Sequence, residues 1–383
     1  MFNNHNLNKL YLSEAFRNFS ISMISIFVPI YLIIIGYNIY QVALFFLLNA
    51  ILCVIISIPI GKFGARFGFK YLILISMPFQ ILFFALLFSL EDASTPLYLL
   101  VIVKSLASRF YHLGKISLLA KFTEKGKRGA EVGVNKILNK LSSIPGPLIG
   151  GYLLTLLDTN ILLFIILIFL LFATAPLFFI KEKRQKVNLN LRNTFQDLNF
   201  SEKIVLINKG IDDSMDDFVW PVYAFFFILN EYFVLGLVKV VQKSFSLVSH
   251  YVSGKLFDKN GVSIIRFGGI ASLFIWIGRI FAYNPFFVYI VDSFRGLLHP
   301  LIATGFDAEC YELADTKHKL ISFIMVREIL IHVGRIILFG VLLVVQDLKL
   351  MLFVGIIYSL IYMKFKFDDG VIPTKICENG EVN

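Results

Sequence analysis

Charged residues inside apolar segments are the feature of this sequence that points most directly to chemistry. The apolar segment that begins near residue 208 opens with Asp212, Asp213, Asp216 and Asp217. On a helix, Asp213 and Asp217 share one face, and Asp212 and Asp216 share the next. Four such carboxylates facing lipid would cost on the order of 10 kcal/mol to insert. We therefore expect them to face water or basic partners, or to take up protons, as a proton carrier does. A hydrated helix end is the alternative, and it stays open for Asp212 and Asp213.

Further charges lie in the other apolar segments. The candidates for proton or substrate coupling are Asp213, Asp216, Asp217, Asp292, Glu328 and His332. The candidates for a substrate cavity are Lys104, Arg109, Lys243, Arg295 and Arg327. Counted together with the further bases Lys136, Lys140, Lys239 and Arg335, the charges inside the spans lean positive, which favours a polar, zwitterionic or anionic solute over a lipophilic cation.

Some of these charges have a structural interpretation instead. Residues three or four apart are neighbours on a helix, so two candidate pairs could simply stabilise it. These pairs are Asp292 with Arg295, and Glu328 with His332. We interpret Arg17, Lys136 and Lys140 as long side chains that reach back to the membrane interface.

The composition of the chain indicates which kind of structural element positions these residues. The chain has 383 residues, of which 57% are hydrophobic and 16% charged, and its mean hydropathy is +0.78. Soluble domains carry about 25% charged residues, so a two-domain soluble enzyme is excluded, and disorder is excluded by the apolar content. An all-α integral membrane protein with many spans remains. A net charge of +10 is typical of Lys and Arg retained in cytoplasmic loops and does not indicate nucleic-acid binding.

Apolar stretches of about 20 residues, the length of a membrane span, recur along the whole chain. They predict twelve transmembrane helices, at 12–36, 41–60, 70–90, 96–118, 134–157, 160–180, 208–229, 233–252, 264–283, 285–304, 321–345 and 348–364. Breaks after even-numbered spans are basic and the other breaks are not, so both termini are expected in the cytoplasm and the protein in the cell membrane. Cys310 and Cys377 then face the cytoplasm and should be reduced.

The chain also contains a tandem repeat. Val28-Pro29-Ile30-Tyr31 corresponds to Trp220-Pro221-Val222-Tyr223, with an offset of 192 residues from Pro29 to Pro221. The loops that begin at Gly61 and Gly254 correspond with an offset of 193 residues. Repeats of this kind place transporter sites at the repeat interface. We predict a first bundle at 1–180, a cytoplasmic linker at 181–207, a second bundle at 208–366 and a cytoplasmic tail at 367–383.

On these residues the sequence resembles the major facilitator superfamily. The family's cytoplasmic gating-loop motif is matched in the first half by Gly61, Arg66 and Gly68, and in the second by Gly254, Asp258 and Gly261. Ala65 replaces the acidic residue of the motif in the first half, which puts that half of the gate in doubt. Span five carries Gly146, Pro147, Gly150 and Gly151, which resemble the family's antiporter motif. A packing seam is the equal alternative there. The resemblance implies two pseudo-symmetric six-helix bundles around a central cavity, and a monomer.

We therefore expect a secondary transporter of a small polar or charged solute that works by alternating access and couples to protons. A multidrug and proton antiporter and a facilitator of diffusion are the alternatives within this class. From other classes, a non-transporting receptor or scaffold and a polytopic lipid enzyme stay open. The sequence contains no phosphate-binding loop, nucleophile elbow or metal-ligand cluster, so we expect no enzyme activity, cofactor or metal. The expected partners are the solute, protons and the lipid bilayer.

Overall fold

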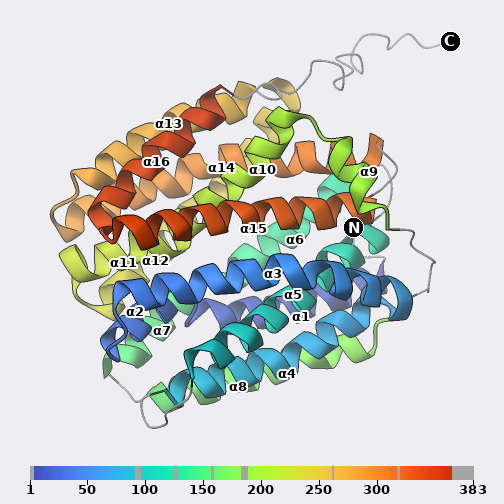
Figure 1. Ribbon diagram of the computed structural model, residues 1–383, viewed down its shortest axis with the longest axis horizontal. Coiled ribbons are helices and arrows are strands. Elements are labelled where there is room, and N and C mark those ends of the chain that lie inside the picture. Colours follow the sequence, from blue (N-terminus) through green and yellow to red (C-terminus); the bar gives the residue numbers. More distant parts are fainter. Residues whose placement is uncertain are drawn as a thin grey trace.

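A computed structural model describes residues 4–90, 96–123, 128–156, 159–182, 189–260, 263–316 and 320–364. In these segments the chain forms helices and no strand. Most helices run side by side along the longest axis of the molecule (Figure 1). The described N-terminal residues and α9 lie at one end of this axis, and α2, α7 and α11 lie toward the other.

The helices of the first half follow the predicted spans. They are α1 (His5–Ser22), α2 (Val28–Ile34), α3 (Ile39–Phe67), α4 (Phe69–Phe88), α5 (Leu97–Phe122), α6 (Arg128–Ser143), α7 (Gly146–Leu156) and α8 (Thr159–Phe178). The helices of the second half are α9 (Leu191–Gln196), α10 (Phe200–Ser214), η1 (Met215–Val219), α11 (Trp220–Ala224), η2 (Phe225–Leu229), α12 (Tyr232–Asn260), α13 (Ser263–Ile280), α14 (Pro285–Thr316), α15 (Leu320–Val345) and α16 (Leu348–Met363).

Three predicted spans are interrupted, and each interruption lies beside a proline. The first breaks between α1 and α2, where Pro29 lies in the first turn of α2. The second breaks between α6 and α7, before Pro147. The third runs as α10, η1, α11 and η2, with Pro221 in the first turn of α11. Proline has no backbone N–H, so it is tolerated at the start of a helix and interrupts one elsewhere. The repeated prolines thus give both halves a broken first span.

Within the described residues, seven helical segments are long and apolar enough to cross a membrane by themselves. They are Ile39–Phe67, Phe69–Phe88, Thr159–Phe178, Tyr232–His250, Ser263–Ile280, Pro285–Asp307 and Leu320–Val345. The shorter α16 is also apolar. The spans predicted at 12–36, 134–157 and 208–229 are divided among shorter helices, so no single helix there meets the criterion. The span predicted at 96–118 forms the unbroken helix α5, which is not among the seven either. The chain is a multi-pass membrane protein.

The two halves meet along α3 against α15 and along α7 against α12. Glycine permits the closest approaches. A Cβ added at Gly150 would lie 1.8 Å from the Met23 carbonyl oxygen, and one at Gly236 would lie 2.3 Å from the Pro147 carbonyl oxygen. Gly151 likewise faces the Tyr232 backbone. The glycines of span five therefore lie in a tight packing seam, which joins α7 to α1 and α12.

The loop motif of the first half lies at the α9 end. Gly68 ends α3 with φ of +114°, a conformation that favours glycine. A Cβ added at Gly61 would lie 2.1 Å from Met325 Cε on α15, and the guanidinium of Arg66 lies 5.3 Å from the Phe67 ring. Of the second copy, Gly254 and Asp258 lie in the last turns of α12, whereas Gly261 lies outside the described residues.

Glu182 supplies a carboxylate near the loop in which Ala65 replaces the motif acid. Its side chain accepts the Lys70 backbone N–H at 2.9 Å, in the first turn of α4, and pairs with Lys121 at 2.7 Å. Lys70 Nζ donates in return to the Phe178 and Ile180 carbonyls, each at 2.9 Å, at the end of α8. A carboxylate at a helix N-terminus and a cation at a C-terminus are both favourable. This clasp ties α4, α5 and α8 together within the first half.

Candidate functional site

A cavity of about 620 Å³ lies between the two halves. Side chains from α1, α3, α4, α5 and α6 line it on one side, and side chains from η1, α12, α14 and α15 line it on the other. Pockets that hold small molecules span roughly 300–1,000 Å³, so the cavity is large enough for an organic metabolite. The candidates Lys104, Asp213, Asp216, Asp217, Lys243 and Arg295 all line it.

A web of buried ion pairs forms the wall from the second half. Arg295 donates to Asp212 at 2.5 Å, to Asp216 at 2.5 and 2.7 Å and to Ser272 Oγ at 3.0 Å. Arg279 donates to Asp216 at 2.6 Å and to Asp292 at 2.7 Å. Two guanidinium groups therefore bridge the three carboxylates at short range, and partners of opposite charge are what buried charges require.

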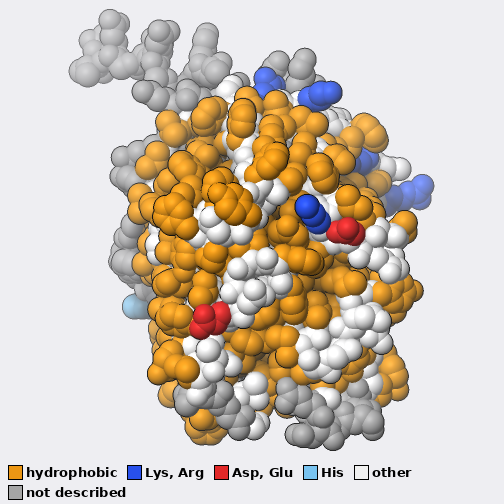
Figure 2. All heavy atoms as spheres, turned by 90° about the vertical axis from the view of Figure 1, so that its left-hand side faces the viewer, with side chains coloured by type: hydrophobic (Ala, Val, Ile, Leu, Met, Phe, Trp, Pro, Cys, Tyr) orange, Lys and Arg blue, Asp and Glu red, His pale blue; other side chains and the backbone are white. Residues whose placement is uncertain are grey.

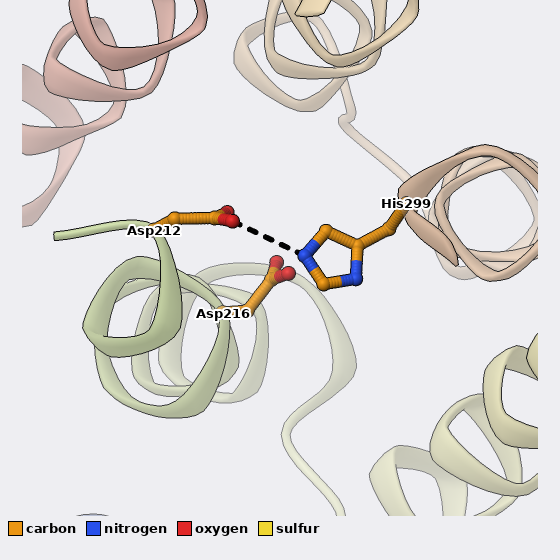
Figure 3. A group of neighbouring side chains, drawn as sticks. All are labelled: Asp212, Asp216 and His299. Carbon is orange, nitrogen blue, oxygen red and sulfur yellow. Dashed lines mark hydrogen bonds and ion pairs between the residues drawn. The ribbon is translucent and has the colours of Figure 1, made fainter. Parts of the chain in front are cut away.

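Aromatic rings, a lysine and a histidine complete this web. The Arg279 guanidinium lies 4.7 Å from the Trp220 ring and 4.5 Å from the Trp276 ring, which is cation–π geometry. Lys239 lies 3.7 Å from Asp292. His299 Nε2 lies 3.1 Å from Asp212 Oδ2 and faces Asp216 as well (Figure 3). The web thus draws on η1, α10, α12, α13 and α14.

Asp212, Asp216 and His299 place one ligand atom each within 4.8 Å of one another. That spacing is compatible with a metal site. The Arg295 guanidinium, however, already lies 2.5 Å from both carboxylates and supplies the positive charge there. The donor set therefore forms an ion-pair cluster around an arginine and does not fit a dication in addition.

The remaining acids of this segment differ in their partners. Asp213 lies 2.5 Å from Lys209 Nζ and 3.8 Å from Arg335. Asp217 is exposed to the cavity, and within the described parts of the chain it has no hydrogen bond or ion pair. Both Asp216 and Asp217 lie in the π-helical turn η1, and such turns are frequent at functional sites.

Three lysines in the cavity lack an acidic partner. Lys104 lies over the Phe83 and Phe46 rings, 4.6 and 5.5 Å from their centres. Lys243 Nζ donates to the Ser143 carbonyl at 2.8 Å. Lys140 lines the cavity between the halves. Among the described residues, no carboxylate lies within ion-pair distance of any of the three.

Among the residues that the structure describes, two ion-pair contacts cross from one half to the other on the α9 side of the cavity. Arg109 on α5 lies 3.3 Å from Glu328 on α15. Lys136 on α6 lies 2.6 Å from Asp307 on α14, and Arg327 shares that carboxylate at 2.7 Å. Lys136 and Glu328 lie 192 residues apart, the repeat offset, so one member of each pair lies at an equivalent position with opposite charge.

Aromatic rings close the opposite side of the cavity. Phe46 of α3 stacks on Phe339 of α15, with 5.4 Å between their ring centres, and packs edge-on against Phe218 of η1, with 5.0 Å between ring centres. Phe27 and Tyr232 make a further cross-half contact at 5.4 Å. Cross-half ion pairs thus lie on the α9 side of the cavity, and cross-half aromatic contacts lie on the α2 and α11 side.

The structure pairs several residues differently from the sequence expectation. Asp292 pairs with Arg279 and Lys239, and Arg295 with Asp212 and Asp216, so the two are not partners of each other. Glu328 pairs with Arg109, while His332 Nδ1 lies 2.9 Å from the Glu328 carbonyl oxygen.

The side chains expected to reach the interface are placed differently as well. Arg17 is buried, with its guanidinium 3.3 Å from the centre of the Tyr111 ring. Lys136 crosses between the halves and Lys140 lines the cavity. Each side chain therefore finds a polar or aromatic partner, or the cavity itself, inside the protein.

Sequence reasoning missed Arg279, Asp307 and Lys209. Arg279 lies near the end of an apolar segment, where a base is usually an interfacial one. Asp307 follows the predicted end of its span at residue 304, whereas α14 continues to Thr316. The buried pair of Glu14 and Lys115, at 3.0 Å, was missed too. Lys209 lies four residues before its partner Asp213, a spacing visible in the sequence. The partners of Arg279, Asp307 and Lys115 lie on other helices, so only the folded arrangement reveals them.

Comparison with known proteins identifies the family. The model of the Major Facilitator Superfamily matches residues 10–308. The chain is also 25% identical to the uncharacterized protein YqgE of Bacillus subtilis (strain 168) over 311 residues, which cover 73% of this chain and 71% of that protein. With most of its length matched and its charged cavity enclosed between two helical halves, the chain belongs to the Major Facilitator Superfamily, a family of membrane transporters.

Proposed function

We propose that this protein is a proton-coupled secondary transporter of a small polar or charged solute. Its twelve spans would form two six-helix halves, 1–180 and 208–366, that rock around the central cavity. The observation that supports this proposal is the cavity of about 620 Å³, lined by charged side chains from both halves. A site built from both halves changes its access when the halves move.

The two cross-half ion contacts suit a gate on the α9 side. Opening that side would break the pairs of Arg109 with Glu328 and of Lys136 with Asp307. Opening the other side would separate Phe46 from Phe339 and Phe218. A transporter that closes its α9 side with ion pairs and its other side with aromatic contacts, in alternation, would need both sets of contacts.

We assign the α9 end to the cytoplasm. Lys9, Lys70 and Lys121 lie at that end and bind helix-end carbonyls or Glu182. On the opposite end, hydrophobic side chains cover most of the described surface and charged ones are few (Figure 2). Lysine and arginine are retained on the cytoplasmic side of membrane proteins, so this difference favours cytoplasmic termini.

Asp217 is our candidate for the proton carrier. Asp212 and Asp216 are held by Arg295, and Asp213 by Lys209. A carboxylate that exchanges protons during transport needs access to water and a small cost of neutralisation, and an arginine partner raises that cost. Asp217 is the acid of this segment that combines exposure to the cavity with no ion-pair partner among the described residues.

A flux assay tests the proposal. The protein is reconstituted in liposomes that contain a pH-sensitive dye and is challenged with pools of organic acids, amino acids, sugars and lipophilic cations. We expect at least one pool to move protons, and Asp217→Asn to abolish that movement while the solute still binds. If no pool caused protons to move, coupled transport would be contradicted. Solute uptake without proton movement would indicate that the protein is a facilitator of diffusion instead.

A multidrug antiporter is the second candidate, and one observation favours it. Gly146 and Gly150 pack against Ser22 and Met23 of the first half, whereas Gly151 and the Pro147 carbonyl face Tyr232 and Gly236 of the second half. Lipophilic cations would then be the pool that moves protons. The unpaired lysines of the cavity weigh against this candidate, because they repel cations.

A further inference from the structure

We propose that the transported solute carries at least two negative charges, and that Lys104, Lys140 and Lys243 bind it across the two halves. This inference rests on the proposed transport function and adds the charge class of the solute. It follows from the balance of charge in the cavity and from where the unpaired charges lie.

The cavity carries more positive than negative charge. Seven of its lining residues are lysine or arginine and three are aspartate. Two of the three carboxylates are engaged by arginine, Asp216 by Arg295 and Asp213 by Arg335. Asp217 is then the remaining acid against three unpaired lysines. Of the other two bases, Lys239 is balanced by Asp292 outside the lining, and Arg17 lies over the Tyr111 ring. The surplus is therefore at least two positive charges, which sets the smallest charge of a ligand that would balance it.

The three lysines are placed to contact one molecule from both sides. Lys104 and Lys140 belong to α5 and α6 of the first half, and Lys243 belongs to α12 of the second. Lys243 interacts electrostatically with Lys140, which repels it, and with Asp217, which attracts it. Lys104 instead has Arg335 as its repelling neighbour. One anionic group between Lys140 and Lys243 and another near Lys104 would relieve both repulsions.

The surplus charge is costly without a ligand. Taking a charge out of water without a partner costs several kcal/mol, and an ion pair recovers much of that cost. A dianion would therefore stabilise the enclosed cavity, whereas a neutral solute would leave the repulsion in place. The volume of about 620 Å³ accommodates an organic di- or tricarboxylate or a phosphate monoester.

A charge series of equal size tests the inference by binding. The purified full-length protein is titrated with succinate, a dianion, with succinamate, a monoanion, and with neutral succinamide, and the midpoint of thermal unfolding is recorded. Citrate, glycerol phosphate and choline extend the panel. We expect dianions to raise the midpoint most and the neutral and cationic probes to leave it unchanged. Equal shifts with mono- and dianions, or shifts with neutral or cationic probes alone, would overturn the inference.

Variants separate binding from structure. Lys140→Gln and Lys243→Gln should each weaken dianion binding about tenfold or more, since a charge-assisted hydrogen bond contributes about 1.5–3 kcal/mol. Without ligand, both should unfold at a higher temperature than the wild type, because one repelling charge is gone. Lower unfolding temperatures without ligand would mean that these lysines are structural, against the inference. Lys349→Gln, on an exposed lysine outside the cavity, is the matched control.

The flux assay keeps the two proposals distinguishable. Proton movement driven by neutral or cationic pools, with no response to dianions, would refute the charge class and leave the transporter intact. If no pool produced either flux or a thermal shift, both proposals would be refuted. Flux with dianions that survives in the double variant Lys140→Gln/Lys243→Gln would refute the assignment of these lysines.

Discussion

The pair of Arg109 and Glu328 makes the strongest prediction about alternating access. The two side chains are 1% and 10% exposed, lie 3.3 Å apart and belong to different halves. Arg109 Nε and Nη1 have no further hydrogen-bond partner among the described residues. Removing one partner leaves a buried, uncompensated charge, which costs about 3–5 kcal/mol. Since opening the α9 side would hydrate that charge, Arg109→Gln or Glu328→Gln should shift the protein toward the state open on that side.

The expected size of the shift follows from this cost. About 3 kcal/mol corresponds to roughly a hundredfold change in the conformational equilibrium. The double variant Arg109→Gln/Glu328→Gln has no uncompensated charge and should return most of the way to the wild type. The signature is therefore non-additive, with each single variant more open than the double variant.

A cysteine in the cavity reports the change. Ser25 lines the cavity at the break between α1 and α2, and Ser25→Cys is introduced after serine replaces the three native cysteines. Labelling by a membrane-impermeant maleimide is timed from the α9 side. Lys121→Gln is the control, because neither Lys121 nor its partner Glu182 belongs to the second half. Equal labelling of single, double and control variants would refute the assignment of this pair as a gate.

Three further predictions concern stability and the motifs. Arg295→Gln removes the cation that the buried Asp212 shares with Asp216 and should lower the free energy of unfolding by about 3–5 kcal/mol, measured by thermal unfolding in detergent; a loss below 1 kcal/mol would contradict the ion-pair web. Gly150→Ala should lower the free energy of unfolding by about 1–3 kcal/mol through overpacking. Gly340→Ala, with open space around it, should leave that free energy unchanged or raise it. Similar effects of the two variants would rule out tight packing at Gly150. Glu182→Gln should lower the free energy of unfolding by about 2 kcal/mol and speed amide hydrogen exchange at the N-terminal end of α4. Unchanged exchange there would contradict the role of Glu182 in joining these helices.

Apolar length predicts where helices lie, but not where they end. The span predicted at 160–180 corresponds to Thr159–Phe178, and that at 41–60 to the longer Ile39–Phe67. Helices α12 and α14 continue well past their apolar segments, to Asn260 and Thr316. Polar residues there still form helix because the backbone hydrogen bonds continue beyond the hydrocarbon region. This is why Asp307 appears as a loop residue in the sequence and as a cross-half partner in the fold.

Partners of buried charges could not be predicted from spacing. The sequence identified Asp216, Asp292 and Arg295 as charges in apolar segments, since such residues avoid lipid. It could not tell that Arg279, from another helix, would bridge Asp216 and Asp292. Pairs at helical spacing compete with pairs between helices, and the geometry of helix packing decides between them.

Electrical recording on a supported membrane tests the central claim, that a dianion crosses through the lysine-lined cavity together with protons. Proteoliposomes receive rapid pulses of a dianion identified in the binding panel, and the charge movement is recorded with and without a pH gradient. We predict a current for the wild type that grows with the gradient and disappears in Lys140→Gln/Lys243→Gln. Asp217→Asn should retain only a brief binding signal. Currents that respond to neutral or cationic solutes and not to any dianion would contradict the account.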